Sequence, residues 1–239
     1  MKIDCTGKKY DILNQEIFAA SGDVTLENCL GQRFIGAGAE GRTITINGVP
    51  GNALGAYLNG AGIIVNGNAQ DATGDTMNAG RIVVHGRCGD AAGYAMRGGE
   101  IFIEGDVGYR AGIHMKAYKE KYPVLVFGGR SGSFLGEYQA GGLIIALGLS
   151  CREEDILGNF CATGMHGGRI LVRADRLCVR LSKQIESRRA ADEDMVLAAP
   201  YIKEYCGCFG IPEEAVYNKG FFVLTPNSSN PYKQLYIQN

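Results

Sequence analysis

Short runs of β-branched and other aliphatic residues recur along the chain, and glycine-rich polar stretches separate them. Four such runs, at residues 43–46, 62–65, 81–84 and 100–103, follow one another with a constant 19-residue period. Each run predicts a short β-strand. Because the period is constant, we predict that the strands are copies of one repeating unit rather than unrelated elements.

Glycines repeat with the same period as the predicted strands. The full motif has two residues between its first and second glycines and three between its second and third. Its members are Gly48, Gly51, Gly55, Gly67, Gly74, Gly86, Gly89, Gly93, Gly105, Gly108, Gly112, Gly129, Gly132 and Gly136. Gln70 replaces the central glycine of the second copy, and an insertion at residues 117–123 lengthens the interval before the last copy. Glycine tolerates positive φ and close backbone approach, so we expect these residues at the corners of coils.

Stacking the copies places equivalent residues in columns. Two columns are aliphatic throughout: Ile44, Ile63, Ile82 and Ile101, and Ile46, Val65, Val84 and Ile103. Since they are two positions apart, they share one side of the strands and are predicted to fill the interior. A third column is predicted to line another wall of the same interior: Leu58, Met77, Met96 and Met115. The column of Asn47, Asn66, His85 and Glu104 is polar and is expected to face solvent.

Between the two interior columns, alternation places a further column on the outside of the stack. Its members are Thr45, Ile64, Val83 and Phe102. Apolar side chains in a contiguous outer strip indicate a surface that is normally covered. Two covers fit the sequence: the chain's own C-terminal helices, or another subunit, in which case this strip is the candidate partner surface.

These patterns predict an all-β fold, a single-stranded β-helix of about seven 19-residue coils with a small helical C-terminal extension. A leucine-rich repeat needs leucines at fixed offsets, which are lacking here, and a hexapeptide helix needs a six-residue sub-period. The predicted domains are an N-terminal cap (1–28), the repeat domain (29–175) and a C-terminal extension with a tail (176–239). We expect the stack to break at residues 150–155 and to resume irregularly at residues 164–172.

The C-terminal extension has a different composition from the repeat. Helices are predicted over residues 186–197 and 201–205, with Pro200 starting or kinking the second one. An extended stretch at residues 221–224 precedes a polar tail.

Composition narrows the classes of protein that remain. The chain has 36 glycines but only 6 prolines and no Gly-X-Y period, which excludes collagen and argues against disorder. The net charge is -1 and the 24 lysines and arginines are dispersed, so nucleic acid is not an expected partner. The sequence lacks an apolar run long enough to cross a membrane and a signal-peptide pattern, and we expect a cytoplasmic protein without a membrane partner.

Candidate chemical motifs are weak. Residues 36–41 match the dinucleotide pattern GxGxxG, but a predicted strand at residues 42–46 follows where that site requires a helix. The eight cysteines form no CxxC pair and are expected to be free thiols. The acidic run at residues 153–155 is expected to be solvated. We therefore predict no catalytic, cofactor-binding or metal-binding residues in this chain.

The glycine motif on strands of Ile and Val resembles the GXGXG domain at the C-terminal end of the glutamate synthase large subunit. The resemblance covers about residues 28–175 and extends more weakly to residues 221–226. It implies a right-handed β-helix. A similar domain occurs as one of the subunits of formylmethanofuran dehydrogenase, so the motif leaves two kinds of enzyme complex open.

The resemblance also implies which parts of glutamate synthase are missing here. That enzyme releases ammonia with an N-terminal cysteine, whereas this chain begins Met1-Lys2 and its first thiol is Cys5. It reduces 2-oxoglutarate on a barrel that holds FMN and an iron-sulfur cluster, and neither the barrel pattern nor a cysteine cluster is present.

The implied function is that of a non-catalytic scaffold subunit of a split glutamate synthase. Its implied partners are a glutamine amidotransferase subunit and a synthase subunit that holds FMN and the iron-sulfur cluster. The alternative is a component of formylmethanofuran dehydrogenase or of another multisubunit oxidoreductase.

Overall fold

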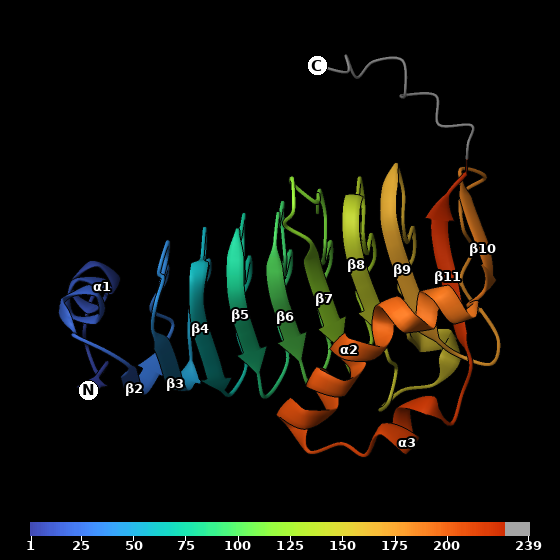
Figure 1. Cartoon of the computed structure of the whole chain (residues 1–239). Coiled ribbons are helices and arrows are strands. Elements are labelled where there is room, and N and C mark those ends of the chain that lie inside the picture. Colours follow the sequence, from blue (N-terminus) through green and yellow to red (C-terminus); the bar gives the residue numbers. More distant parts are fainter. Residues whose placement is uncertain (228–239) are drawn as a thin grey trace, which may run out of the picture.

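The computed structural model describes residues 1–227 and shows a β-solenoid, in which each coil contributes one strand to a single sheet (Figure 1). The strands are β1 (Lys2–Asp4), β2 (Val24–Leu30), β3 (Thr43–Val49), β4 (Asn59–Asn66), β5 (Ala79–Val84), β6 (Gly99–Ile103), β7 (Pro123–Phe127), β8 (Ala140–Ala146), β9 (Gly167–Arg173), β10 (Ile185–Arg189) and β11 (Phe221–Pro226). The helices are α1 (Tyr10–Ala19), the 3-10 helix η1 (Glu153–Asp155), α2 (Asp192–Phe209) and α3 (Glu213–Tyr217). Strands β1 to β9 pair in parallel in sequence order, and β11 and β10 continue the sheet antiparallel.

The strand register confirms the predicted columns. Ile44 pairs with Ile63, and the same alignment continues through Ile82 to Ile101. Both aliphatic columns and the Leu58-to-Met115 column are fully buried. The interior is therefore a continuous apolar core that runs the length of the stack.

The first coil begins earlier than the repeat predicts. Strand β2 lies in the stretch expected to act as a cap, and its Val24 and Leu26 continue the two interior columns. Strands β2 to β9 make eight parallel coils instead of about seven. The interval from Val24 to its partner Ile44 is one position longer than the 19-residue period, and the register shifts after Leu26. Because of this irregular interval, the 19-residue period in the sequence does not reveal the coil. Helix α1 then covers the N-terminal end and buries Leu13 and Ile17.

Both insertions lie outside the paired strands. The segment before β7 forms a short bridge between Tyr118 and Lys121, and β6 and β7 remain in register. The expected interruption at residues 150–155 is an inserted loop that contains η1, and the stack resumes with β9 within about the predicted residues 164–172. The loop does not separate the coils, because β8 and β9 pair, with Ile144 opposite Ile170. The interval between these two partners is longer than the 19-residue period, and the additional residues are accommodated around η1.

A second wall closes the coils opposite the strands. We call it the turn wall, and it comprises residues 34–38, 53–57, 72–76, 91–95, 110–114, 134–138 and 160–164. In one coil Ala53, Gly55 and Tyr57 all have positive φ, between 57° and 62°. The Ala53 N–H donates to Asp71 O in the next coil at 2.9 Å, whereas the Gly55 N–H donates to Ile35 O in the previous coil at 2.9 Å. Alternate amides therefore bond in opposite directions along the stack.

The C-terminal extension contains more strand than expected. Residues 185–189 form β10 rather than the start of a helix, because they pair with β11, which itself pairs with β9. Helix α2 runs without interruption over residues 192–209, and Pro200 lies inside it. The predicted extended stretch at residues 221–224 is confirmed as part of β11. The predicted polar tail lies outside the described residues.

Helices α2 and α3 lie beside the C-terminal half of the stack (Figure 1). None of the helices within residues 1–227 is both long enough and apolar enough to cross a bilayer.

Candidate interaction face on the turn wall

The outer apolar strip is covered by the chain itself. Phe102 is fully buried and Val83 is nearly so, in a cluster with Ile202 and Tyr205 of α2. The Tyr205 hydroxyl also donates to Glu104 O at 3.0 Å. The prediction of a partner surface is therefore wrong for Val83 and Phe102. Strands β10 and β11 return the chain to the sheet, and this places α2 across the strip.

The cover ends between Val83 and Ile64 of the strip. Phe209, the last residue of α2, contacts the ring of His85 edge-on at 5.1 Å, next to β5. Beyond this point the outer column continues as Ile64 and Thr45, which are half-buried. For these two residues the partner surface stays a prediction.

The motif glycines meet two different requirements. Gly93 and Gly112 have φ of +70° and +68°, in the left-handed region that glycine adopts without strain. A Cβ atom at Gly112 would also overlap the Ile144 side chain in the interior. At Gly51 the φ angle is not positive, and a Cβ atom would overlap the Gly31 carbonyl of the previous coil. Ala53 and Tyr57 of the turn wall also have positive φ, so backbone conformation alone does not require glycine there. At Gly112 the interior packing excludes a side chain, whereas at Gly51 close coil-to-coil contact excludes it.

Side-chain acceptors occupy the space that the corner glycines leave. Asp71 Oδ1 accepts from the Asp90 N–H at 2.9 Å, and Asp90 Oδ1 accepts from the Tyr109 N–H at 2.8 Å. A Cβ atom at Gly89 or Gly108 would overlap these carboxylate oxygens. Asn68 and Asp106 make equivalent bonds to the N–H groups of Arg87 and Arg130. This series of side-chain-to-backbone hydrogen bonds was not predicted, although the 19-residue spacing of Asp71 and Asp90 is a signal for it.

An open groove of roughly 780 Å³ runs along this corner. Its carboxylates are already engaged, since Asp90 accepts a backbone N–H and Asp106 pairs with Arg130 at 3.5 Å. The groove side chains thus support the stacking of coils. None of them forms an acid/base or nucleophile pair with a neighbour that would suggest catalysis.

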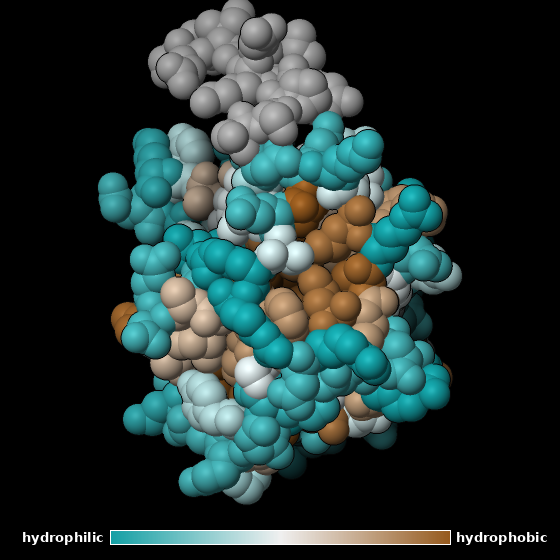
Figure 2. All heavy atoms as spheres, turned by 90° about the vertical axis from the view of Figure 1, so that its right-hand side faces the viewer, coloured by the Kyte–Doolittle hydropathy of each residue, from teal (hydrophilic) through white to brown (hydrophobic). Residues whose placement is uncertain are grey.

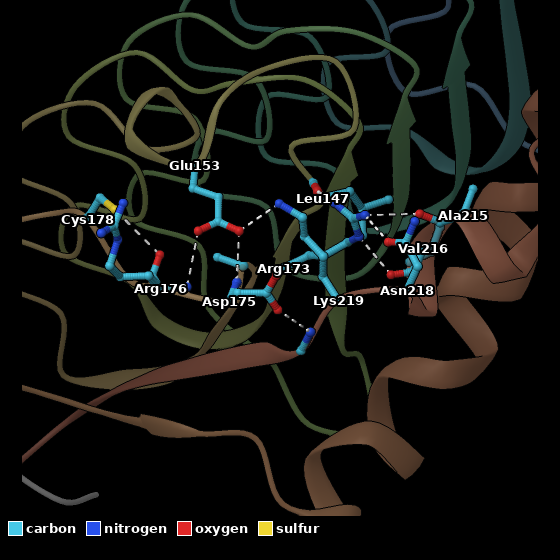
Figure 3. A network of polar contacts seen from close by, with 12 residues as sticks. Leu147, Glu153, Arg173, Asp175, Arg176, Cys178, Ala215, Val216, Asn218 and Lys219 are labelled. Atoms are coloured by element: carbon cyan, nitrogen blue, oxygen red, sulfur yellow. Dashed lines mark hydrogen bonds and ion pairs between the residues drawn. The ribbon is translucent and has the colours of Figure 1, made fainter.

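Glu153 is a structural clamp rather than the solvated residue expected from the sequence. Its carboxylate accepts from the Asp175 N–H at 3.0 Å, the Arg176 N–H at 3.2 Å and the Lys219 ammonium at 2.6 Å (Figure 3). The Asp175 N–H bond and the Lys219 bond lower the pKa of Glu153 to about 2. The inserted loop is thereby fixed to the C-terminal extension.

Arg173, at the end of β9, completes this attachment. The guanidinium is buried and donates to Val216 O at 2.7 Å and to Ala215 O at 3.1 Å, next to the end of α3 (Figure 3). It also donates to Leu147 O at 3.2 Å. Burial lowers the pKa of Arg173 from its ordinary value. The residue joins two coils and α3 through backbone carbonyls.

The C-terminal end of the stack is closed by side chains from the segment after β9. Leu177, Val179 and Leu181 are partly buried against the interior. Figure 2 shows apolar side chains at the centre of this end and polar side chains around them. These three residues alternate with more exposed neighbours along one segment. That segment therefore places its apolar side chains against the core and closes its end.

The turn wall, in contrast, carries exposed aromatic side chains. They are Phe34, Tyr57, Tyr94, Tyr138 and Phe160, each between 39% and 60% exposed. Two pairs stack on neighbouring coils: Phe134 on Phe160 at 5.0 Å, and His114 on Tyr138 at 5.2 Å. The sequence did not indicate this face, because its rings are interspersed with small residues. It is the candidate interaction face of the molecule.

A parallel solenoid with glycine corners places the chain in the class of β-helix repeat proteins. The chain matches the GXGXG motif family over residues 7–217 and belongs to that family. This is the domain found in the C-terminal region of the glutamate synthase large subunit. Over 248 aligned residues the chain is 42% identical to the uncharacterized protein MJ1350 of Methanocaldococcus jannaschii, with 98% of this chain and 95% of that protein covered.

Proposed function

We propose that this chain is the non-catalytic scaffold subunit of a split glutamate synthase. The observation that carries the proposal is the GXGXG family match over residues 7–217, on a stack whose interior columns are apolar from end to end. In this proposal a glutamine amidotransferase chain releases ammonia. A second chain with FMN and an iron-sulfur cluster forms glutamate from 2-oxoglutarate.

The geometry of the chain supports a scaffold role. The inside is filled with side chains, the carboxylates of Asp71 and Asp90 in the corner groove accept coil-to-coil hydrogen bonds, and α2 covers part of the outer sheet face. The donor set does not fit an iron-sulfur cluster, because within residues 1–227 no three His, Cys, Asp or Glu side chains lie together as possible ligands. The exposed turn wall then offers a surface for other chains.

The test is isolation of the tagged chain from its native host under mild conditions, with mass spectrometry of the chains that co-purify. Amidotransferase and flavin-type synthase chains are expected. Subunits of a pterin-containing oxidoreductase would favour the formylmethanofuran dehydrogenase alternative instead.

The chain purified alone provides a second test. It should bind neither FMN nor nicotinamide nucleotide, and it should show no glutaminase or glutamate synthase turnover until the partner chains are added. A yellow, flavin-loaded preparation of this polypeptide by itself would overturn the proposal.

A further inference from the structure

One column of the turn wall carries side chains that its backbone does not favour. Every member has positive φ: Gly38, Tyr57, Thr76, Ala95, His114, Tyr138 and Gly164. Glycine at both ends of the column shows that the backbone itself accepts a residue without a side chain. L-residues are strained in this conformation, and bulky ones are uncommon there.

Burial does not compensate for this strain. Tyr138 is 44% exposed, and His114 is also exposed. The two rings stack at 5.2 Å with 13° between their planes, and Tyr94 contacts His114 edge-on at 6.0 Å. A Cβ atom at Gly164 would lie 2.5 Å from the Tyr138 ring, so this glycine makes room for the ring. The result is a ladder of three mutually contacting, partly exposed rings.

Positive charge lies next to this ladder. Arg97 and Lys116 occupy the following column on neighbouring coils, since their N–H groups donate to Met77 O and Met96 O. Both side chains are exposed, and within residues 1–227 neither forms an ion pair with a carboxylate. Lys116 and His114 also lie close enough to His166 to reinforce the effect of burial in lowering the pKa of His166.

We infer that Tyr94, Arg97, His114, Lys116 and Tyr138, here called the ladder patch, dock an acidic surface of a protein partner. This inference rests on the proposed function, in which that partner is a catalytic chain of glutamate synthase. Uncompensated cations match carboxylates, and rigid exposed aromatic rings bind with little loss of side-chain entropy. A nucleic acid is disfavoured, because the rings already contact one another and leave no gap for a base, and the net charge is -1.

The column suggests a variant that removes the rings without straining the backbone. His114→Gly combined with Tyr138→Gly removes both rings and introduces the residue that already occupies Gly38 and Gly164. The double variant should keep its circular dichroism spectrum, and its Tm should stay equal or rise. Its affinity for the catalytic chains, measured by titration of the purified complex components, should fall by at least about tenfold, as for interface hot spots.

Tyr57→Gly is the matched control. Tyr57 belongs to the same column, has φ of +57° and is 58% exposed, but its column neighbour on the next coil is Thr76 rather than a ring. This variant should leave affinity unchanged. Arg97→Gln with Lys116→Gln should weaken binding and flatten its dependence on salt, because the removed attraction is electrostatic.

The outcomes separate the inference from the proposed function. Full assembly by both double variants overturns the ladder patch while the proposed function stands. Ladder-dependent binding of an identified acidic protein other than glutamate synthase chains supports the patch and overturns the proposed function. Absence of any acidic protein partner for the wild-type chain overturns both. Tight binding of a single-stranded oligonucleotide that is lost in the His114→Gly/Tyr138→Gly variant would overturn the inference that the partner is a protein.

Discussion

Asp90 Oδ1 accepts a hydrogen bond at 2.8 Å from the N–H of Tyr109, a residue one coil further along the stack. This bond passes through the space that a side chain at Gly108 would fill. The glycine motif therefore does more than permit turns. At the corner it lets one coil satisfy a backbone donor of the next, which matters because unsatisfied polar groups are costly at a close-packed contact.

Gly108→Ala should destabilise the chain by about 2 kcal/mol or more, because the added methyl group displaces the Asp90 carboxylate and presses on the backbone beneath it. The urea unfolding midpoint measures the effect. Gly207→Ala is the control, since Gly207 lies in α2 and a methyl group added there would have no atom within 4 Å. It should stabilise the chain slightly through helix propensity. Equal losses at both sites would contradict the role assigned to the corner glycines.

Gly93→Ala and Gly112→Ala should differ although their φ angles are almost equal. A Cβ atom at Gly93 would have its nearest neighbours at 3.8 Å, so the cost should be about 1 kcal/mol of backbone strain. At Gly112 the methyl group would additionally overlap Ile144, and we expect a cost larger by about 1 to 3 kcal/mol. Thermal or urea unfolding of the two variants provides the comparison. A larger loss for Gly93→Ala would show that the packing at these corners is wrongly assigned.

Phe102→Ala should lower the free energy of unfolding by about 3 to 5 kcal/mol, because the ring is fully buried beneath α2. Thr45→Ala, in the same outer column but beyond the helix, should have little effect. Far-ultraviolet circular dichroism during urea titration reports the change. An unaltered Phe102→Ala midpoint accompanied by loss of partner binding would restore this residue to the partner surface.

Glu153 should make the attachment of the C-terminal extension sensitive to acid. Its folded pKa of about 2 is below the ordinary value of 4.5, so its contribution is complete above pH 4.5 and is lost as the pH falls toward 2. Glu153→Gln should remove much of this dependence and cost about 1 to 2 kcal/mol at neutral pH. Hydrogen exchange of α3 and β11 between pH 2 and pH 6 would measure it. Glu154→Gln, which alters an exposed neighbour paired with Arg152, should preserve the wild-type acid profile.

Much of the stack could be predicted because its structure repeats as its sequence does. Where the 19-residue period holds, equivalent residues such as Ile63 and Ile82 must lie above one another. All members of a column then share one environment, and the composition of the column indicates whether that environment is the interior or the surface. The prediction was incomplete where the interval changed and the glycine motif was also incomplete. Val24 precedes its partner by one position more than the period, and the coil that contains Gly158 is lengthened by the insertion around η1.

The sequence by itself determined the coil period, the interior columns and the positions where glycine is required, because these depend on local spacing and on the alternation of strand side chains. Tertiary structure alone decided what covers Phe102, how residues 185–189 pair, and that Glu153 holds Lys219. These contacts join segments far apart in the chain, and their free energy depends on which surfaces meet after folding. The same holds for the ladder of His114 and Tyr138, whose strained backbone and uncovered rings became visible only once the coils were stacked.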